Sequence, residues 1–165
     1  MLISTSRKPS QKTRQFCKNL SHVFGCNYVN RGKMNMRDLL LKALELDEVN
    51  LAVVNQIKGN PSRITFYSNN GEELLTILVT VSVSSSRLNI QPSKLKLVSK
   101  VDELDVLSNI FNIELKPTAT ENYILISSLK DEDDIAKISF FNKFGSKCDL
   151  QIYVKKILWL MKALY

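Results

Sequence analysis

The chain has 165 residues, 44% of them hydrophobic and 24% charged, which suits one folded domain or two small, closely packed halves. No apolar run approaches the ~20 residues that cross a bilayer, and the N-terminus turns basic before a secretory core could form. We therefore expect a cytoplasmic protein without a membrane partner. Three cysteines without C-x-x-C spacing and a single histidine indicate reduced structural thiols, no metal site and no cofactor.

The net charge of +7 is concentrated in the first third of the chain. Residues 1–63 hold 11 Lys and Arg against 4 Asp and Glu, whereas residues 64–165 hold 12 of each kind. The first 37 residues carry eight basic side chains and no acidic one. A surface of one sign suits a polyanion such as nucleic acid. The alternative is a solvated face that only keeps the protein in solution.

Apolar periodicity predicts two helices in the first half, at residues 10–24 and 36–46. Gly25 suits the residue just past the end of the first helix, whose outer face is polar and cationic. Asn35, followed three residues later by Asp38, predicts the N-terminal capping box of the second helix. Strands are expected at residues 2–5, 27–29, 49–57, 63–68 and 72–83.

A Ser-rich segment, residues 84–94, separates the first half, residues 1–83, from a shorter second half, residues 95–165, within one domain. The second half repeats the first. Residues 20–25 are echoed by residues 107–112, and the predicted hairpin at 63–71 by residues 137–145. The sequence therefore predicts an α/β fold with a duplicated unit, whose second copy lacks the helix at 36–46.

Two features of the second half leave alternatives open. An acidic run at residues 131–134 is interpreted as a solvated loop, with a metal site as the alternative. Residues 155–165 are apolar enough for a short packed helix or a tail that docks a partner. Trp159 would then be a core or interface anchor.

Three short basic segments, residues 6–10, 30–33 and 58–63, each follow a predicted strand. If those strands are parallel, their C-terminal ends share one edge of the sheet, and the three segments meet there. Cations and free backbone N–H groups at such an edge would bind phosphate, although the P-loop spacing is absent and turn formation accounts for some of the glycines. The predicted RNA-binding residues are Arg7, Lys8, Ser10, Lys12, Arg14, Asn30, Arg31, Gly32, Lys33, Lys58, Gly59, Asn60, Ser62 and Arg63.

These segments carry a family resemblance. Residues 5–10 with Thr13, Arg14 and Phe16, then residues 28–34, then residues 58–63 ahead of Phe66 and Tyr67, resemble the successive signature motifs of Brix-domain proteins. The similarity covers essentially the whole chain, is weaker in the second half, and in its compact length is similar to archaeal members.

The resemblance implies two pseudo-symmetric α/β halves, each similar to an anticodon-binding domain of class II aminoacyl-tRNA synthetases. It also implies a role in pre-ribosomal RNA processing and subunit assembly. The partners would be ribosomal or pre-ribosomal RNA and, in addition, ribosomal or assembly proteins.

Two other classes of function compete with RNA binding. An enzyme such as a nuclease would need paired carboxylates, a histidine dyad or a metal cluster near the basic loops, and the first carboxylate is Asp38, so we predict a protein without catalytic activity. A protein-interaction scaffold would touch RNA only incidentally. Tyr28 or Tyr67 could stack on bases, with core packing as the alternative for each.

Overall fold

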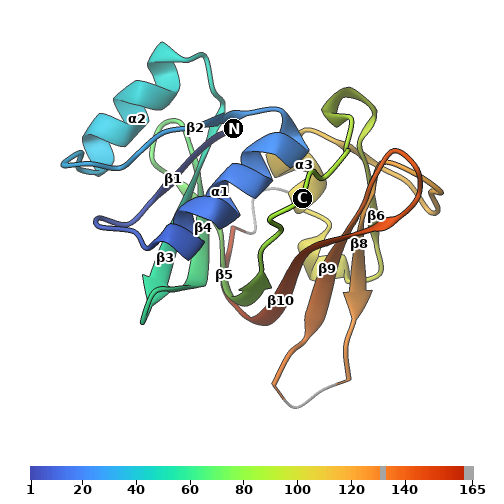
Figure 1. Ribbon diagram of the computed structural model, residues 1–165. Helices are drawn as coiled ribbons and strands as arrows, with labels where there is room; N and C mark the ends of the chain where they lie inside the picture. Colours follow the sequence, from blue (N-terminus) through green and yellow to red (C-terminus); the bar gives the residue numbers. More distant parts are fainter. Residues whose placement is uncertain (131–132, 162–165) are drawn as a thin grey trace.

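The computed structural model describes residues 1–130 and 133–161, and these residues form one ten-stranded sheet with helices on both faces (Figure 1). The strand order is β2-β1-β3-β4-β5-β10-β9-β8-β6-β7. The first half contains β1 (Leu2–Thr5), α1 (Gln11–Phe24), β2 (Asn27–Tyr28), α2 (Met36–Glu45), β3 (Asn50–Ile57), β4 (Asn60–Ser68) and β5 (Glu73–Ser82). The second contains β6 (Lys96–Ser99), α3 (Leu107–Phe111), β7 (Glu114–Leu115), β8 (Tyr123–Ser128), β9 (Ala136–Phe141) and β10 (Lys147–Leu160).

The strand pairing repeats from one half to the other. β1 lies parallel to both β2 and β3, and β3, β4 and β5 continue antiparallel; β6 lies parallel to both β7 and β8, and β8, β9 and β10 continue antiparallel. The two series meet where β5 pairs antiparallel with β10. This repeat agrees with the predicted duplication. The likeness of each half to an anticodon-binding domain stays a prediction.

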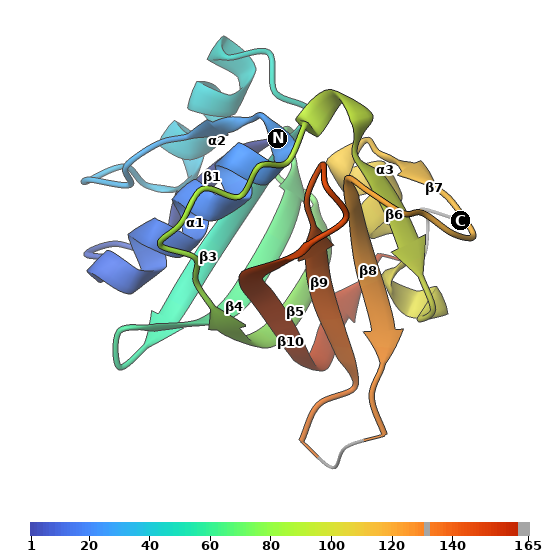
Figure 2. The ribbon, with the colours of Figure 1, turned by 45° about the vertical axis from the view of Figure 1, so that its right-hand side comes forward.

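The helix α1 forms where its sequence supplies both ends and one apolar face. The Ser10 hydroxyl accepts a hydrogen bond from the Thr13 backbone N–H, and Gly25 ends the helix in the left-handed conformation, with φ of +60°. Phe16, Leu20 and other apolar side chains of this helix are buried against the sheet. The segment 84–94 crosses over α1 (Figure 2) and is tied to it by buried Asn19 of α1.

α2 covers the opposite face of the sheet, but only over the outer strands. Leu39 and Ala43 of α2 pack against Leu2 of β1 and against Leu51 and Val53 of β3. This explains why β3 is apolar on both faces, as its unbroken apolar run predicts. α2 is capped as expected: Oδ1 of Asn35 accepts a hydrogen bond from the Asp38 backbone N–H, and the Asp38 carboxylate accepts one from the Asn35 backbone N–H. On the same face, β4 and β5 extend beyond α2 and leave an open surface.

The prediction for the C-terminal segment was wrong. Residues up to Leu160 are not a helix or a tail: they continue β10, which pairs with β5 as far as Leu160 opposite Leu75. Two irregularities, between Val154 and Lys156 and between Ile157 and Trp159, interrupt this pairing. Such bulges break the two-residue alternation by which a strand is recognised in a sequence. Residues 162–165 and two residues of the acidic run, 131 and 132, lie outside the described residues.

Candidate nucleic-acid interface

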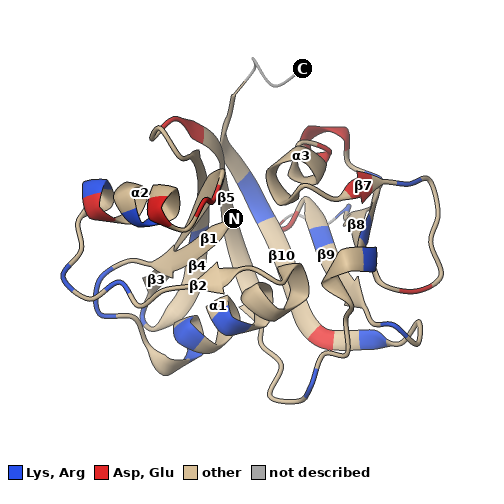
Figure 3. Cartoon of the chain, turned by 90° about the horizontal axis from the view of Figure 1, so that it is seen from above, with Lys and Arg blue, Asp and Glu red and all other residues tan. Residues whose placement is uncertain are grey.

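The three basic segments meet at one edge of the sheet. β2, β1 and β3 are adjacent and parallel, so their C-terminal ends point the same way. Arg7 and Lys8 follow β1, Lys33 lies in the loop after β2, and Lys58 follows β3. In Figure 3 Lys and Arg, in blue, occupy the loops beside β1, β2 and β3. The predicted parallel arrangement of these three strands, with their C-terminal ends at one edge of the sheet, is therefore confirmed.

A network of hydrogen bonds joins the first of these segments to the third. The Ser10 hydroxyl donates to the backbone oxygen of Gly59 at 2.6 Å, and the Ser10 N–H donates to Oε1 of Gln56 at 2.9 Å. Lys12 Nζ donates to Oδ1 of Asn60 at 3.0 Å. The turn that receives these bonds is tight, because Lys58 and Gly59 both have positive φ, +50° and +76°. The two segments therefore form one surface with a fixed shape.

Arg31 attaches the remaining segment to the same surface. Its side chain is only 9% exposed; Nε donates to the backbone oxygen of Met34 at 2.7 Å, and Nη1 donates to that of Thr5 at 2.9 Å. Desolvation, and secondarily the nearby Arg7, lowers the pKa of the Arg31 guanidinium. Arg31 therefore holds the loop after β2 against the end of β1, in addition to carrying charge.

The predicted site residues fall into two groups. Seven cations are exposed to solvent, where a polyanion could contact them: Arg7, Lys8, Lys12, Arg14, Lys33, Lys58 and Arg63. The smaller polar residues mostly shape the loops. Asn30 accepts a hydrogen bond from the Tyr28 hydroxyl, and Ser62 donates one to the backbone oxygen of Asn55. Gly32 has φ of +53° and open space where a side chain would lie, so its backbone is accessible.

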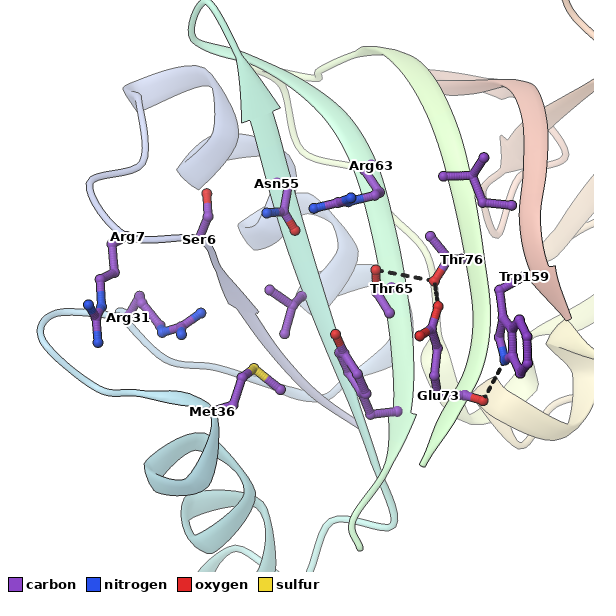
Figure 4. Close-up of a pocket in the computed structure, with 13 residues that line it drawn as sticks. Ser6, Arg7, Arg31, Met36, Asn55, Arg63, Thr65, Glu73, Thr76 and Trp159 are labelled. Carbon is purple, nitrogen blue, oxygen red and sulfur yellow. Dashed lines mark hydrogen bonds between the residues drawn. The ribbon is translucent and has the colours of Figure 1, made fainter. Parts of the chain in front are cut away.

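Beside the basic loops a pocket of about 740 Å³ lies on the open face of β3, β4 and β5 (Figure 4). Arg7 and Arg31 line its α2 side, Arg63 rises from β4, and Trp159 of β10 lines the far side. Trp159 was predicted to be a core or interface anchor; because it is 52% exposed, it is not a core residue, and the interface role stays a prediction. This pocket could not be predicted from the sequence, because Trp159 reaches it only through the pairing of β10 with β5.

The two tyrosines considered for stacking differ in position. Tyr28 is half-buried against the main core, and this burial raises the pKa of its hydroxyl. Tyr67 packs partly against the smaller core under α2 and also lines the pocket. Both side chains therefore pack partly against a hydrophobic core, and that of Tyr67 also faces the pocket.

The described residues offer no cluster of three or more metal-ligating side chains. Burial raises the pKa of the Cys17 thiol to about 12 and that of Cys26 to about 11, and neither is in a disulfide. Within residues 1–130 and 133–161, no helix is long and apolar enough to cross a membrane.

The chain is similar to archaeal proteins of known family. It is 36% identical over 122 residues to a probable Brix domain-containing ribosomal biogenesis protein of Methanothermobacter thermautotrophicus, an alignment that covers 74% of this chain and 76% of the relative. The chain belongs to the Brix-domain family. The family predicted from the motifs is thus confirmed, although a scan against family models finds no match.

Solved structures agree with this Brix-domain assignment. The crystal structure of Mil, an archaeal Imp4-like protein, matches with a TM-score of 0.82 and 30% identity, over 95% of this chain and 97% of that one. A probable ribosomal biogenesis protein from Aeropyrum pernix has the same fold, with a TM-score of 0.73 and 24% identity over 98% of both chains. In the Brix domain described here, the segments that carry the motif resemblance are those joined by Ser10, Gln56 and Arg31.

Proposed function

We propose that this Brix-domain protein assists ribosome assembly by binding ribosomal or pre-ribosomal RNA through the converging basic loops of its first half. The observation that carries the proposal is the joining of three cationic segments, far apart in the sequence, into one hydrogen-bonded surface at the ends of parallel strands. Such a surface combines exposed cations with accessible backbone N–H groups, as phosphate binding requires.

The protein would act by binding and not by catalysis, and its work would take place in the cytoplasm. The relatives' names as ribosomal biogenesis proteins support the assembly role. The second half, residues 95–165, carries ten basic and ten acidic residues, so it suits contact with a ribosomal or assembly protein better than contact with RNA backbone.

The test compares two variants of equal charge. The first replaces four exposed cations of the basic loops by Gln: Arg7, Lys8, Lys33 and Lys58. The matched control replaces four exposed lysines that lie outside the first half by Gln: Lys94, Lys100, Lys130 and Lys143. Each lowers the net charge from +7 by four, to +3. Arg31 is left in place because its hydrogen bonds hold the loop.

Binding of ribosomal RNA fragments is measured by filter retention across a salt series. At about 0.7 to 0.9 per phosphate contact, the log–log slope should fall by about 3 for the first variant and stay unchanged for the control. Equal slopes for the two variants would show that the cations of the basic loops contribute no more to RNA binding than lysines elsewhere on the surface. The protein would then be better described as a protein-interaction scaffold.

A further inference from the structure

The floor of the pocket beside the basic loops is formed by strands that pair in a defined register. Trp159 of β10 lies opposite Thr76 of β5, Thr76 opposite Thr65 of β4, and Thr65 opposite Val53 of β3. Neighbouring strands are about 4.8 Å apart, so this row spans about 14 Å from Val53 to Trp159. The floor is polar in its middle, where the Thr65 and Thr76 hydroxyls lie 3.3 Å apart.

Charge is distributed unevenly around this floor. Arg7 and Arg31 line one side of the pocket. Arg63 lies on β4 two residues before Thr65, opposite Asn55 of β3. Among the described residues that line the pocket, the one carboxylate is that of Glu73, the first residue of β5, which lies opposite Tyr67 of β4 and accepts a hydrogen bond from the Thr76 hydroxyl. An anionic ligand group is therefore attracted to the arginine side and repelled from the Glu73 side.

Trp159 offers a fixed aromatic surface on the Glu73 side. Its indole Nε1 donates a hydrogen bond to the backbone oxygen of Glu73 at 3.0 Å, which sets the ring's position, and yet half of the side chain is exposed. A hydrogen-bonded tryptophan that keeps an open face in a concave pocket is well placed to stack on a planar ligand. Tyr67 adds a second aromatic side chain to the same pocket.

We infer that this pocket binds an unpaired RNA base, stacked on Trp159, with the adjoining phosphates held by Arg7, Arg31 and Arg63. The inference rests on the proposed function and names the form of RNA that the surface selects. A nucleotide has a negative end and a planar apolar end, in the same order as the arginine side and the Trp159 side of the pocket. Bases within a duplex are already stacked and offer no free face, so the site selects single-stranded loops or ends.

The chain contains one tryptophan, so stacking can be observed directly in the unmodified protein. Intrinsic fluorescence is titrated with a single-stranded RNA octamer, with a blunt-ended duplex of the same octamer and its complement, and with an octamer of abasic ribose phosphate. We expect the base-containing single strand to quench the fluorescence at saturation. The duplex and the abasic strand should bind in a salt-dependent way without comparable quenching.

Three variants then measure the contribution of the ring, with labelled octamer and fluorescence anisotropy. Trp159→Ala should weaken binding about 5- to 150-fold, the range that corresponds to ~1–3 kcal/mol per stacked base. Trp159→Phe should recover most of the loss. Phe144→Ala removes an aromatic side chain that is 71% exposed but lies in the turn between β9 and β10, outside the pocket, and should change nothing.

The outcomes separate this inference from the proposed function. Salt-dependent binding of the octamer without quenching, and with equal affinity for the native protein and Trp159→Ala, would overturn base stacking and leave RNA binding intact. Absence of binding to every RNA form would overturn both. Because the quenching experiment uses the native chain, a variant that failed to fold would not remove the test.

Discussion

Ser10 connects the folding of α1 to the shape of the proposed RNA surface, and replacing it by Ala tests that connection. The change removes the cap on the Thr13 N–H, which is worth ~1 kcal/mol at a helix N-terminus. It also removes the 2.6 Å hydrogen bond to the Gly59 oxygen, a contribution of ~1 kcal/mol. We therefore expect Ser10→Ala to lower the free energy of unfolding by about 2 kcal/mol.

Urea denaturation at neutral pH measures this loss, with the slope of the unfolding free energy against urea unchanged. The melting temperature should fall by about 4–8 °C for a chain of this size. Ser10→Thr keeps a hydroxyl and should recover most of the stability. The salt slope of RNA binding should stay at the native value, because no cation is lost, while the affinity falls. A loss below about 0.5 kcal/mol would refute the assignment of Ser10 to both roles.

Two further predictions concern other parts of the molecule. Gly145→Ala should destabilise the protein clearly more than Gly32→Ala, since an added Cβ at Gly145 would lie 2.8 Å from the Thr120 backbone oxygen. At Gly32 the added Cβ would meet open space, so that substitution costs only the positive-φ strain of ~1 kcal/mol. Equal losses of unfolding free energy in urea denaturation would contradict this. Burial raises the pKa of the Cys17 thiol from 9.0 to about 12, so the stability it contributes is complete below pH 9 and is lost as pH rises toward 12. Iodoacetamide at pH 8 should accordingly label Cys17 only after denaturation, and rapid labelling of the native chain, seen by peptide mapping, would exclude this burial.

Much of the first half could be predicted because its signals are local. Gly25 and the Asn35–Asp38 box mark helix ends by hydrogen bonds within a few residues, and the structure has these caps. The parallel arrangement of β1, β2 and β3 followed from helices placed between strands. The C-terminal strand could not be predicted in the same way, because bulges in β10 disrupt its alternation and its partner β5 lies more than 60 residues earlier.

The sequence by itself determined the family, the duplicated α/β pattern, and the place where positive charge accumulates, since motifs, periodicity and composition are properties of neighbouring residues. Only the tertiary structure decided what each charged or aromatic residue does. Arg31 is held by the backbone oxygens of Thr5 and Met34, and Trp159 is brought to the arginines by the pairing of β10 with β5. Both outcomes depend on contacts between distant segments, whose geometry is set by packing and strand register and leaves no trace in local sequence.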